Sequence, residues 1–208
     1  MRTVARVVLV LAAISTSVGV SLLNAQAPTQ SLSGDALLKA LRQGGYVIVM
    51  RHATSPRQAP DKQTANADNV SLERQLDEAG RASATAMGNA LRDLKIPVGS
   101  VLTSPTYRAI ETIRLAKLPQ PSSVPELGDG GQSMQGVGSA PSAWLQKKVT
   151  EFPAGTVTLL VTHMPNISAA FPAAAAVADG EALVFGPDGK GGATLVARVK
   201  IEDWARMK

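Results

Sequence analysis

Side chains that interact well with anions follow an apolar run at two places in the sequence. In GYVIVMRHATSP, residues 45–56, Arg51 and His52 come directly after a largely β-branched run. In TVTLLVTHMPNI, residues 156–167, His163 follows a second run of this kind, and the chain contains only these two histidines. Short apolar runs bounded by turn residues are typical of buried strands. Both histidines are therefore predicted to lie just past the end of a strand.

A third stretch, GSVLTSPTYRAIETIRLA at residues 99–116, has the same layout. A short strand over 101–103 is followed by a turn at Ser104 and Pro105, and a helix is predicted to begin near Thr106. Arg108 would lie in the first turn of this helix, where backbone N–H groups add to an anion-binding site. Arg108 is thereby predicted to join the two histidines, although an exposed position paired with Glu111 at i+3 is the ordinary alternative.

Two arginines and two histidines at one place suit phosphoryl chemistry. The guanidinium fork binds phosphate oxygens bidentately and stays charged. A neutral imidazole can attack phosphorus and form a covalent intermediate. A second imidazole can donate hydrogen bonds to the phosphoryl oxygens near the transition state. Since the arginines supply the positive charge that magnesium provides elsewhere, no metal and no cofactor are expected.

The remaining elements follow from apolar periodicity and turn residues. We predict helices at 33–45, at 76–94, from about 106 and at 142–152, a further candidate helix at 167–178, strands at 46–50, 101–103 and 156–161, and two strands within 181–199 joined by a glycine-rich turn. Strands that alternate with helices predict an α/β fold with helices on both faces of the sheet. In a parallel sheet the carboxyl ends of the strands line one crevice, so the four side chains are expected to converge.

Three ordered blocks, VIVMRHATS, LTSPTYRAIET and LLVTHMPNIS, resemble the signature blocks of the histidine phosphatase superfamily, the phosphoglycerate-mutase-like proteins. The segment LERQLDEAGR ahead of the middle block is similar to the small, SixA-like branch. The resemblance extends loosely from about Gly45 to the C-terminus. It implies a three-layer αβα sandwich with a mostly parallel central sheet.

The resemblance also implies a role for each matching residue. His52 would be the nucleophile that becomes phosphorylated, and Arg51, Arg108 and His163 would complete the phosphate pocket. His163 would act both in phosphate binding and in catalysis. The implied enzyme is a histidine acid phosphatase-type phosphomonoesterase.

The proton donor to the leaving group is usually an acid after the middle block in this superfamily. Glu126 in VPELGDGG is the nearest match, Asp129 is a local rival, and Asp61 and Asp68 lie in the first loop. The chain also departs from the family pattern at Ala53, where the family usually has glycine. A methyl group there would narrow the approach to the nucleophile.

Composition excludes several classes of function. The chain has no cysteine, which excludes disulfides and thiol catalysis. Its net charge of +5 falls to +3 if the first 27 residues are removed, because Arg2 and Arg6 leave with them. No run of basic residues interleaved with aromatics is present, so nucleic-acid binding is not expected.

The N-terminus is typical of a secretory signal peptide. Two arginines precede an apolar stretch over 7–23, and the small residues AQA at 25–27 form a cleavage site. We expect a signal peptide at 1–27 and a single domain over 28–208, in the periplasm or secreted, with no stable membrane association after cleavage. An uncleaved anchor is the alternative, since about 20 apolar residues span a bilayer.

Together these features predict an exported, metal-independent phosphatase that acts on a small phosphorylated substrate. Phosphorylated sugars of the cell envelope are one candidate class. Two alternatives remain open at this point: a phosphomutase, and a non-catalytic anion-binding or signalling module on the same fold. The sequence indicates no oligomeric state.

Overall fold

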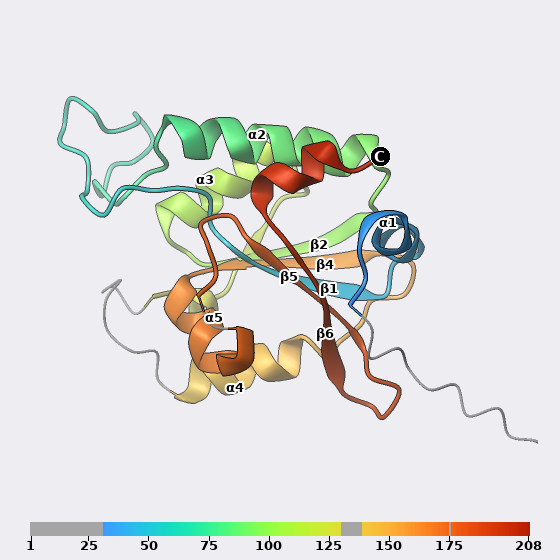
Figure 1. Cartoon of the computed structure of the whole chain (residues 1–208). Helices are drawn as coiled ribbons and strands as arrows, with labels where there is room; N and C mark the ends of the chain where they lie inside the picture. The colour runs from blue at the N-terminus through green and yellow to red at the C-terminus, as the bar shows by residue number, and fades with distance from the viewer. Residues whose placement is uncertain (1–30, 130–138, 175) are drawn as a thin grey trace, which may run out of the picture.

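A computed structural model describes residues 31–129, 139–174 and 176–208 of the chain. The signal peptide predicted at 1–27 lies outside the described residues. The described part forms one six-stranded sheet with helices on both faces, as Figure 1 shows. The predicted three-layer α/β architecture is confirmed.

The sheet is mostly parallel, with the strand order β3-β2-β4-β1-β5-β6. Strands β1 to β4 run in one direction, whereas β5 is antiparallel to β1 and β6 is antiparallel to β5. The strands are β1 (Tyr46–Arg51), β2 (Val98–Thr103), β3 (Ser122–Ser123), β4 (Val157–Thr162), β5 (Ala182–Pro187) and β6 (Ala193–Val199). Because β1 and β4 pair in register from Tyr46↔Val157 to Arg51↔Thr162, the residues that follow them, His52 and His163, emerge side by side.

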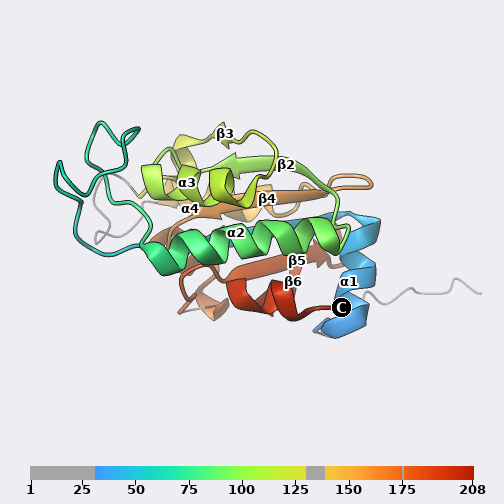
Figure 2. The ribbon, with the colours of Figure 1, turned by 90° about the horizontal axis from the view of Figure 1, so that it is seen from above.

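The helices form two layers, one on each face of the sheet (Figure 1), and the view from above looks down on the layer that contains α2 and α3 (Figure 2). One layer contains α2 (Glu78–Asp93), α3 (Tyr107–Ala116) and the 3₁₀ helix η3 (Ile201–Arg206), with α1 (Gly34–Gln43) at the end of the sheet away from the site. The other contains α4 (Ser139–Lys148) and α5 (Met164–Ala170), with η1 (Pro125–Leu127) and η2 (Pro172–Ala174) beside them.

The alternation of side chains along β1 explains why this strand holds its position firmly. Val47 and Val49 pack into the apolar cluster under α4 and α5, and Ile48 and Met50 pack into the cluster under α1, α2 and η3. All four are at most 2% exposed. Full burial of such a side chain is worth about 1.5–3 kcal/mol, so the end of β1 is fixed from both faces.

The loop that follows β1 is held by its contacts with α2 and α3. Asp77 caps α2 by accepting from the backbone N–H of Gly80 at 2.7 Å, and its own N–H donates to the carbonyl of Thr54. A side chain at Gly80 would meet that carbonyl oxygen at 2.1 Å, so glycine is required where the loop crosses the helix. Buried Glu111 on α3 accepts hydrogen bonds from Asn66 and from the backbone of Leu76.

The structure differs from the sequence prediction after His163. The candidate helix at 167–178 instead begins at Met164 and ends at Ala170, before the short η2. Pro165 occupies the first turn of α5, where its missing N–H costs nothing, and Pro172 prevents the helix from continuing. The short strand β3 and the C-terminal η3 were not predicted. Within the described ranges, no helix is both long and apolar enough to span a membrane.

Candidate functional site

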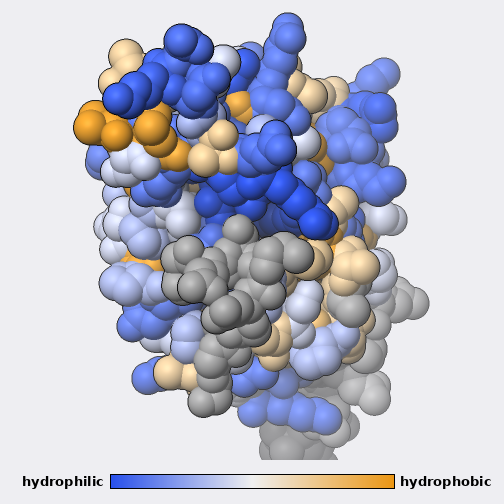
Figure 3. All heavy atoms as spheres, turned by 90° about the vertical axis from the view of Figure 1, so that its left-hand side faces the viewer, coloured by the Kyte–Doolittle hydropathy of each residue, from blue (hydrophilic) through white to orange (hydrophobic). Residues whose placement is uncertain are grey.

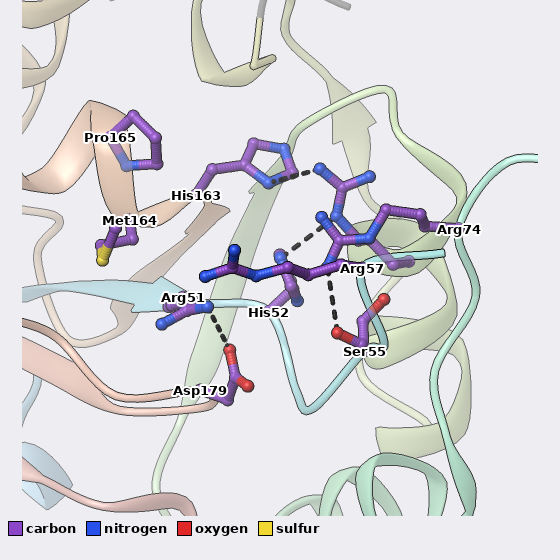
Figure 4. A pocket seen from close by; sticks show the side chains of 10 residues that line it. Arg51, His52, Ser55, Arg57, Arg74, His163, Met164, Pro165 and Asp179 are labelled. Carbon is purple, nitrogen blue, oxygen red and sulfur yellow. Dashed lines mark hydrogen bonds and ion pairs between the residues drawn. The ribbon is translucent and has the colours of Figure 1, made fainter. Parts of the chain in front are cut away.

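A pocket of about 380 Å³ lies at the edge of the sheet where β1 and β4 end. Hydrophilic side chains gather in the middle of this face of the molecule (Figure 3). The lining residues come from the loop after β1, from α3, from the start of α5 and from the turn before β5: Arg51, His52, Ser55, Arg57, Arg74, Arg108, His163, Met164, Pro165 and Asp179. Figure 4 shows the labelled side chains of this set around the cavity.

His52 is buried and held in one tautomer. Its Nδ1 lies 2.7 Å from the carbonyl oxygen of Ala53, which can only accept a hydrogen bond, so Nδ1 carries the proton. Nε2 therefore has its lone pair, and it accepts from Nε of Arg108 at 3.1 Å. The backbone N–H of His52 donates to the carbonyl of Thr162 on β4. These contacts leave Nε2 as the atom available for attack on an electrophile.

His163 is held in the opposite tautomer. Its Nε2 lies 2.8 Å from the hydroxyl of Ser104 and 3.3 Å from that of Thr106, while Nδ1 lies 3.1 Å from Nη2 of Arg108. Because a guanidinium can only donate, Nδ1 is the acceptor and Nε2 carries the proton. The two imidazole rings are 5.2 Å apart and meet edge to face.

Arg108 links the two histidines from the first turn of α3. Besides the contacts to both rings, its Nη2 forms an ion pair with Asp129 at 2.5 Å, and its side chain is only 5% exposed. Glu111, the alternative partner, binds Asn66 and Leu76 and lies near Arg114 instead. The structure thus places Arg108 in the pocket and not in an exposed pair with Glu111.

Arg51 is held by the turn that precedes β5. Nη1 donates to the carbonyl of Val177 at 2.9 Å, and Nη2 lies 2.5 Å from Oδ1 of Asp179. Its Nε is buried and has no hydrogen-bond partner among the described residues. Arg51 is thus fixed on the pocket wall by two acceptors of the turn.

Sequence reasoning missed Arg57 and Arg74, which bring the pocket to four arginines. Arg74 is fixed by donating from Nε to the carbonyl of Pro56 and from Nη2 to that of Ser55 (Figure 4). Burial, reinforced by the charge of Arg108, lowers the pKa of Arg74. Both residues lie in the loop over 54–77. The only sequence feature that could have pointed to Arg74 is its place in the Arg-Gln-Leu-Asp run beside the start of α2.

The acids predicted as proton donors lie in different surroundings. Glu126 is on η1 and is not among the described residues that line the pocket, whereas Asp129 contacts Arg108. Asp61 is exposed and caps a turn through the N–H groups of residues 63 and 64. Asp68 accepts from the hydroxyl of Tyr107 on the outer side of α3.

Sequence reasoning also missed Asp179, which lines the pocket beside Arg51. Only the carboxyl ends of parallel strands were predicted to carry site residues. Strand β5 runs antiparallel to β1, so the residues that precede β5 lie at the same edge of the sheet. That topology could not be read from the alternation of strands and helices alone.

Ala53 does not narrow the pocket. It is fully buried within the cluster under α2 and α3, it is not among the described lining residues, and its N–H donates to the hydroxyl of Thr112 at 3.2 Å. Its backbone is outside the left-handed region that favours glycine. The expected obstruction of the nucleophile by this methyl group is therefore wrong.

Burial makes both histidines poor bases in the ligand-free protein. Desolvation is the largest cause of a lowered pKa for each ring. The neighbouring His163 also lowers the pKa of His52 well below 6.5, and Arg108 helps lower the pKa of His163 to about 3. Both imidazoles are therefore neutral near neutral pH, as a nucleophile requires. No cluster of three or more potential metal ligands occurs within the described ranges.

A comparison with protein families gives one match. Residues 47–129 match the histidine phosphatase superfamily (branch 1), in agreement with the resemblance of the sequence blocks around His52 and Arg108. This range contains Arg51, His52, Arg108 and Asp129. No curated protein matches the sequence.

Solved structures share the fold of the chain at low sequence identity. The structure of the protein histidine phosphatase SixA complexed with tungstate is 22% identical, with a TM-score of 0.55 over 76% of this chain and 98% of that one. A putative phosphohistidine phosphatase SixA from Agrobacterium tumefaciens is 18% identical, with a TM-score of 0.52 over 75% and 98%. A mutant phosphoserine phosphatase from Entamoeba histolytica in complex with phosphoserine is 11% identical, with a TM-score of 0.51 over 76% and 98%.

Proposed function

We propose that this chain is a phosphatase that hydrolyses phosphomonoesters through a phosphohistidine on His52, and the match of residues 47–129 to the histidine phosphatase superfamily supports the proposal. The observation that carries the proposal is the pair of opposite tautomers. Nε2 of His52 is unprotonated and directed at Arg108. The pocket thus offers a neutral nucleophile beside fixed positive charge.

The arginines bind and orient the phosphoryl group in this proposal. Arg108 has Nε beside His52 and Nη2 beside His163, so a phosphate between the rings receives both donors. Arg51, Arg57 and Arg74 add positive charge at the cavity wall. With this charge supplied by side chains, we expect turnover to need no metal ion.

The chemical step is an in-line displacement. Nε2 of His52 attacks phosphorus, the bond to the ester oxygen breaks, and water later hydrolyses the phosphorus–nitrogen bond. The dianionic phosphate raises the pKa of His163, because its charge favours the imidazolium. Nδ1 of His163 can then donate to a phosphoryl oxygen while Nε2 keeps its bond to Ser104.

The substrate is proposed to be a small phosphorylated molecule. Proteins that share the fold are described as a protein histidine phosphatase and a phosphoserine phosphatase. These descriptions support a phosphomonoester or a phosphoramidate as the substrate. A cavity of about 380 Å³ accommodates a phosphoryl group with a small leaving group. Phosphorylated sugars remain within this class.

The activity test uses p-nitrophenyl phosphate, EDTA and the purified protein, with His52→Ala as the variant. Turnover in EDTA that disappears in His52→Ala supports the proposal. Binding of phosphate without turnover over the whole pH range of stability would instead favour the non-catalytic anion-binding module.

Export is a separate proposal, supported by the two arginines, the apolar stretch over 7–23 and the AQA site. Expression of the full chain in a Gram-negative host, followed by fractionation and N-terminal sequencing, tests it. A periplasmic product that begins at or near residue 28 is expected. A full-length product in the membrane fraction would support the uncleaved anchor.

A further inference from the structure

We propose that Asp179 is the proton donor to the leaving group, a role that sequence reasoning gave to Glu126. The inference rests on the proposed phosphatase function and identifies a further catalytic residue for it. Its basis is that the Asp179 carboxyl group lies on the pocket wall beside Arg51 (Figure 4).

The backbone around Asp179 is hydrogen-bonded directly to the backbone of Arg51 and His52. The N–H of Gly180 donates to the carbonyl of His52 at 2.9 Å, and the N–H of Arg51 donates to the carbonyl of Glu181 at 3.1 Å. Glu181 in turn accepts from the N–H of Ala178 at 2.9 Å and pairs with Arg198 on β6. The turn over 177–181 is therefore held by hydrogen bonds, and these fix the backbone of Asp179 relative to that of His52.

The carboxyl group of Asp179 is suited to change its protonation state when substrate binds. Burial raises its pKa, against the opposing charges of Arg51 and Arg74. Oδ1 lies 2.5 Å from Nη2 of Arg51 but accepts no aligned hydrogen bond from the described residues. A bound phosphate dianion competes for Arg51 and repels a second anion, so substrate binding favours the protonated carboxyl.

The other acids near the site are less accessible to a leaving group. Asp129 is 8% exposed and is not among the described lining residues, whereas the Asp179 side chain is 29% exposed and lines the cavity. Glu126 is not among the described lining residues either. Asp179 thus combines an accessible carboxyl group with a place on the wall of the pocket that contains His52.

Asp179 acts as an acid in the first half of the reaction and as a base in the second half. When Nε2 of His52 forms its bond to phosphorus, the ester bond breaks and its electron pair stays on the leaving oxygen, which takes the proton of Asp179. In the second half, the Asp179 carboxylate accepts a proton from the attacking water as the phosphorus–nitrogen bond breaks. The electron pair of that bond returns to Nε2, and phosphate leaves.

The experiment compares two aryl phosphates that differ in their need for a proton donor. 2,4-Dinitrophenolate leaves readily without protonation, whereas phenolate is a poor leaving group. We expect Asp179→Asn to lower kcat/KM for phenyl phosphate by about 10² to 10³-fold, and to lower that for 2,4-dinitrophenyl phosphate by only a few-fold. Asp179→Glu should restore part of the activity on phenyl phosphate. Asp93→Asn, an exposed carboxyl at the other end of α2, is the matched control and should match the wild type on both substrates.

Several outcomes would overturn the inference. If Asp179→Asn lowered both activities equally, Asp179 would only position Arg51. A selective loss in Glu126→Gln or Asp129→Asn, with Asp179→Asn unaffected, would assign the donor to that acid. Circular dichroism and tungstate affinity show whether Asp179→Asn is folded. If it is not folded, the activities on the two aryl phosphates are compared in the Asp179→Glu variant. Failure of the wild type to turn over either substrate would instead overturn the proposed function itself.

Discussion

The ends of β1 and β4 present the same side chain in two different chemical states. Each strand is buried and each is followed by a histidine, at adjacent positions in the sheet. At the end of β1 a backbone carbonyl accepts a hydrogen bond from Nδ1 of His52, and Nε2 of that ring faces Arg108. At the end of β4 the Ser104 hydroxyl accepts a hydrogen bond from Nε2 of His163, and Nδ1 of that ring faces the same guanidinium.

The difference shows that the partner outside the pocket decides the role of each histidine. A carbonyl is an acceptor only, so it keeps the proton of neutral His52 on Nδ1 and the lone pair on Nε2. The Ser104 hydroxyl accepts from Nε2 of His163, so the lone pair of that ring is on Nδ1, where an anion in the pocket favours a second proton. The same strand layout therefore yields one nucleophile and one hydrogen-bond donor.

Removal of the nucleophile is expected to have the largest effect. His52→Gln should lower kcat on p-nitrophenyl phosphate by about 10⁴-fold or more, because no other group can form the covalent intermediate. Tungstate should still bind, since the arginines remain, and calorimetry measures that affinity. Residual activity within tenfold of the wild type would contradict the assigned role.

Two substitutions at His163 separate its ring nitrogens. Glutamine places an amide near the position of Nε2 and keeps a partner for Ser104, while asparagine places one near Nδ1, toward Arg108. If Nδ1 donates to the phosphoryl group, His163→Gln should lower kcat by about 10³-fold, and His163→Asn should lower kcat by about 10²-fold. A more active His163→Gln variant would mean that the Ser104 contact matters more than the contact with phosphate.

The bridge between the two histidines depends on the shape of arginine. Arg108→Lys should lower kcat/KM by about 10²-fold, because an ammonium group cannot replace donors at both Nε and Nη2. Arg114→Lys, on the same helix and exposed, is the matched control and should lie within about twofold of the wild type. Equal losses in the two variants would show that helix stability, and not the bridge, is affected.

The lowered histidine pKa values predict a pH dependence of stability. The unfolded chain binds protons at its histidines as the pH falls below 6.5, whereas folded His163 resists protonation down to a pH of about 3. The free energy of unfolding should therefore decrease as the pH is lowered below 6.5. Urea denaturation measures this decrease, which should be smaller in His163→Asn and smaller in the presence of sulfate. An increase in stability over this range would contradict the neutral assignment.

The smallest effect is expected at Ala53. Ala53→Gly introduces the residue usual for the family, yet activity should stay within about twofold, because the methyl group lies in the core and not in the pocket. Stability should fall by about 1 to 2 kcal/mol, from the loss of a buried methyl group and from the greater backbone freedom of glycine. A large gain in kcat would show that the methyl group does obstruct the nucleophile.

The sequence predicted those parts of the site that follow strands with strong apolar patterns. Arg51, His52 and His163 come directly after runs that could only be buried strands, and the Ser-Pro turn located the start of the helix that carries Arg108. The structure brings all four together at one edge of the sheet.

The remaining site residues depend on long-range geometry that no local pattern encodes. Arg74 reaches the pocket because the end of the loop after β1 returns to the start of that loop, where the carbonyls of Ser55 and Pro56 accept from Arg74. Asp179 reaches it because β5 is antiparallel. Neither residue belongs to a periodic segment, so neither position could be inferred from hydrophobic spacing.

The most direct test is to trap the phosphorylated protein and identify the nitrogen that carries the phosphate. Rapid acid-free denaturation during turnover of 2,4-dinitrophenyl phosphate, followed by mass spectrometry and ³¹P NMR, distinguishes the two ring positions and the two histidines. Phosphate on Nε2 of His52 is the predicted result. Phosphate on His163, or on Nδ1 of His52, would contradict the tautomer assignment on which the proposed mechanism rests.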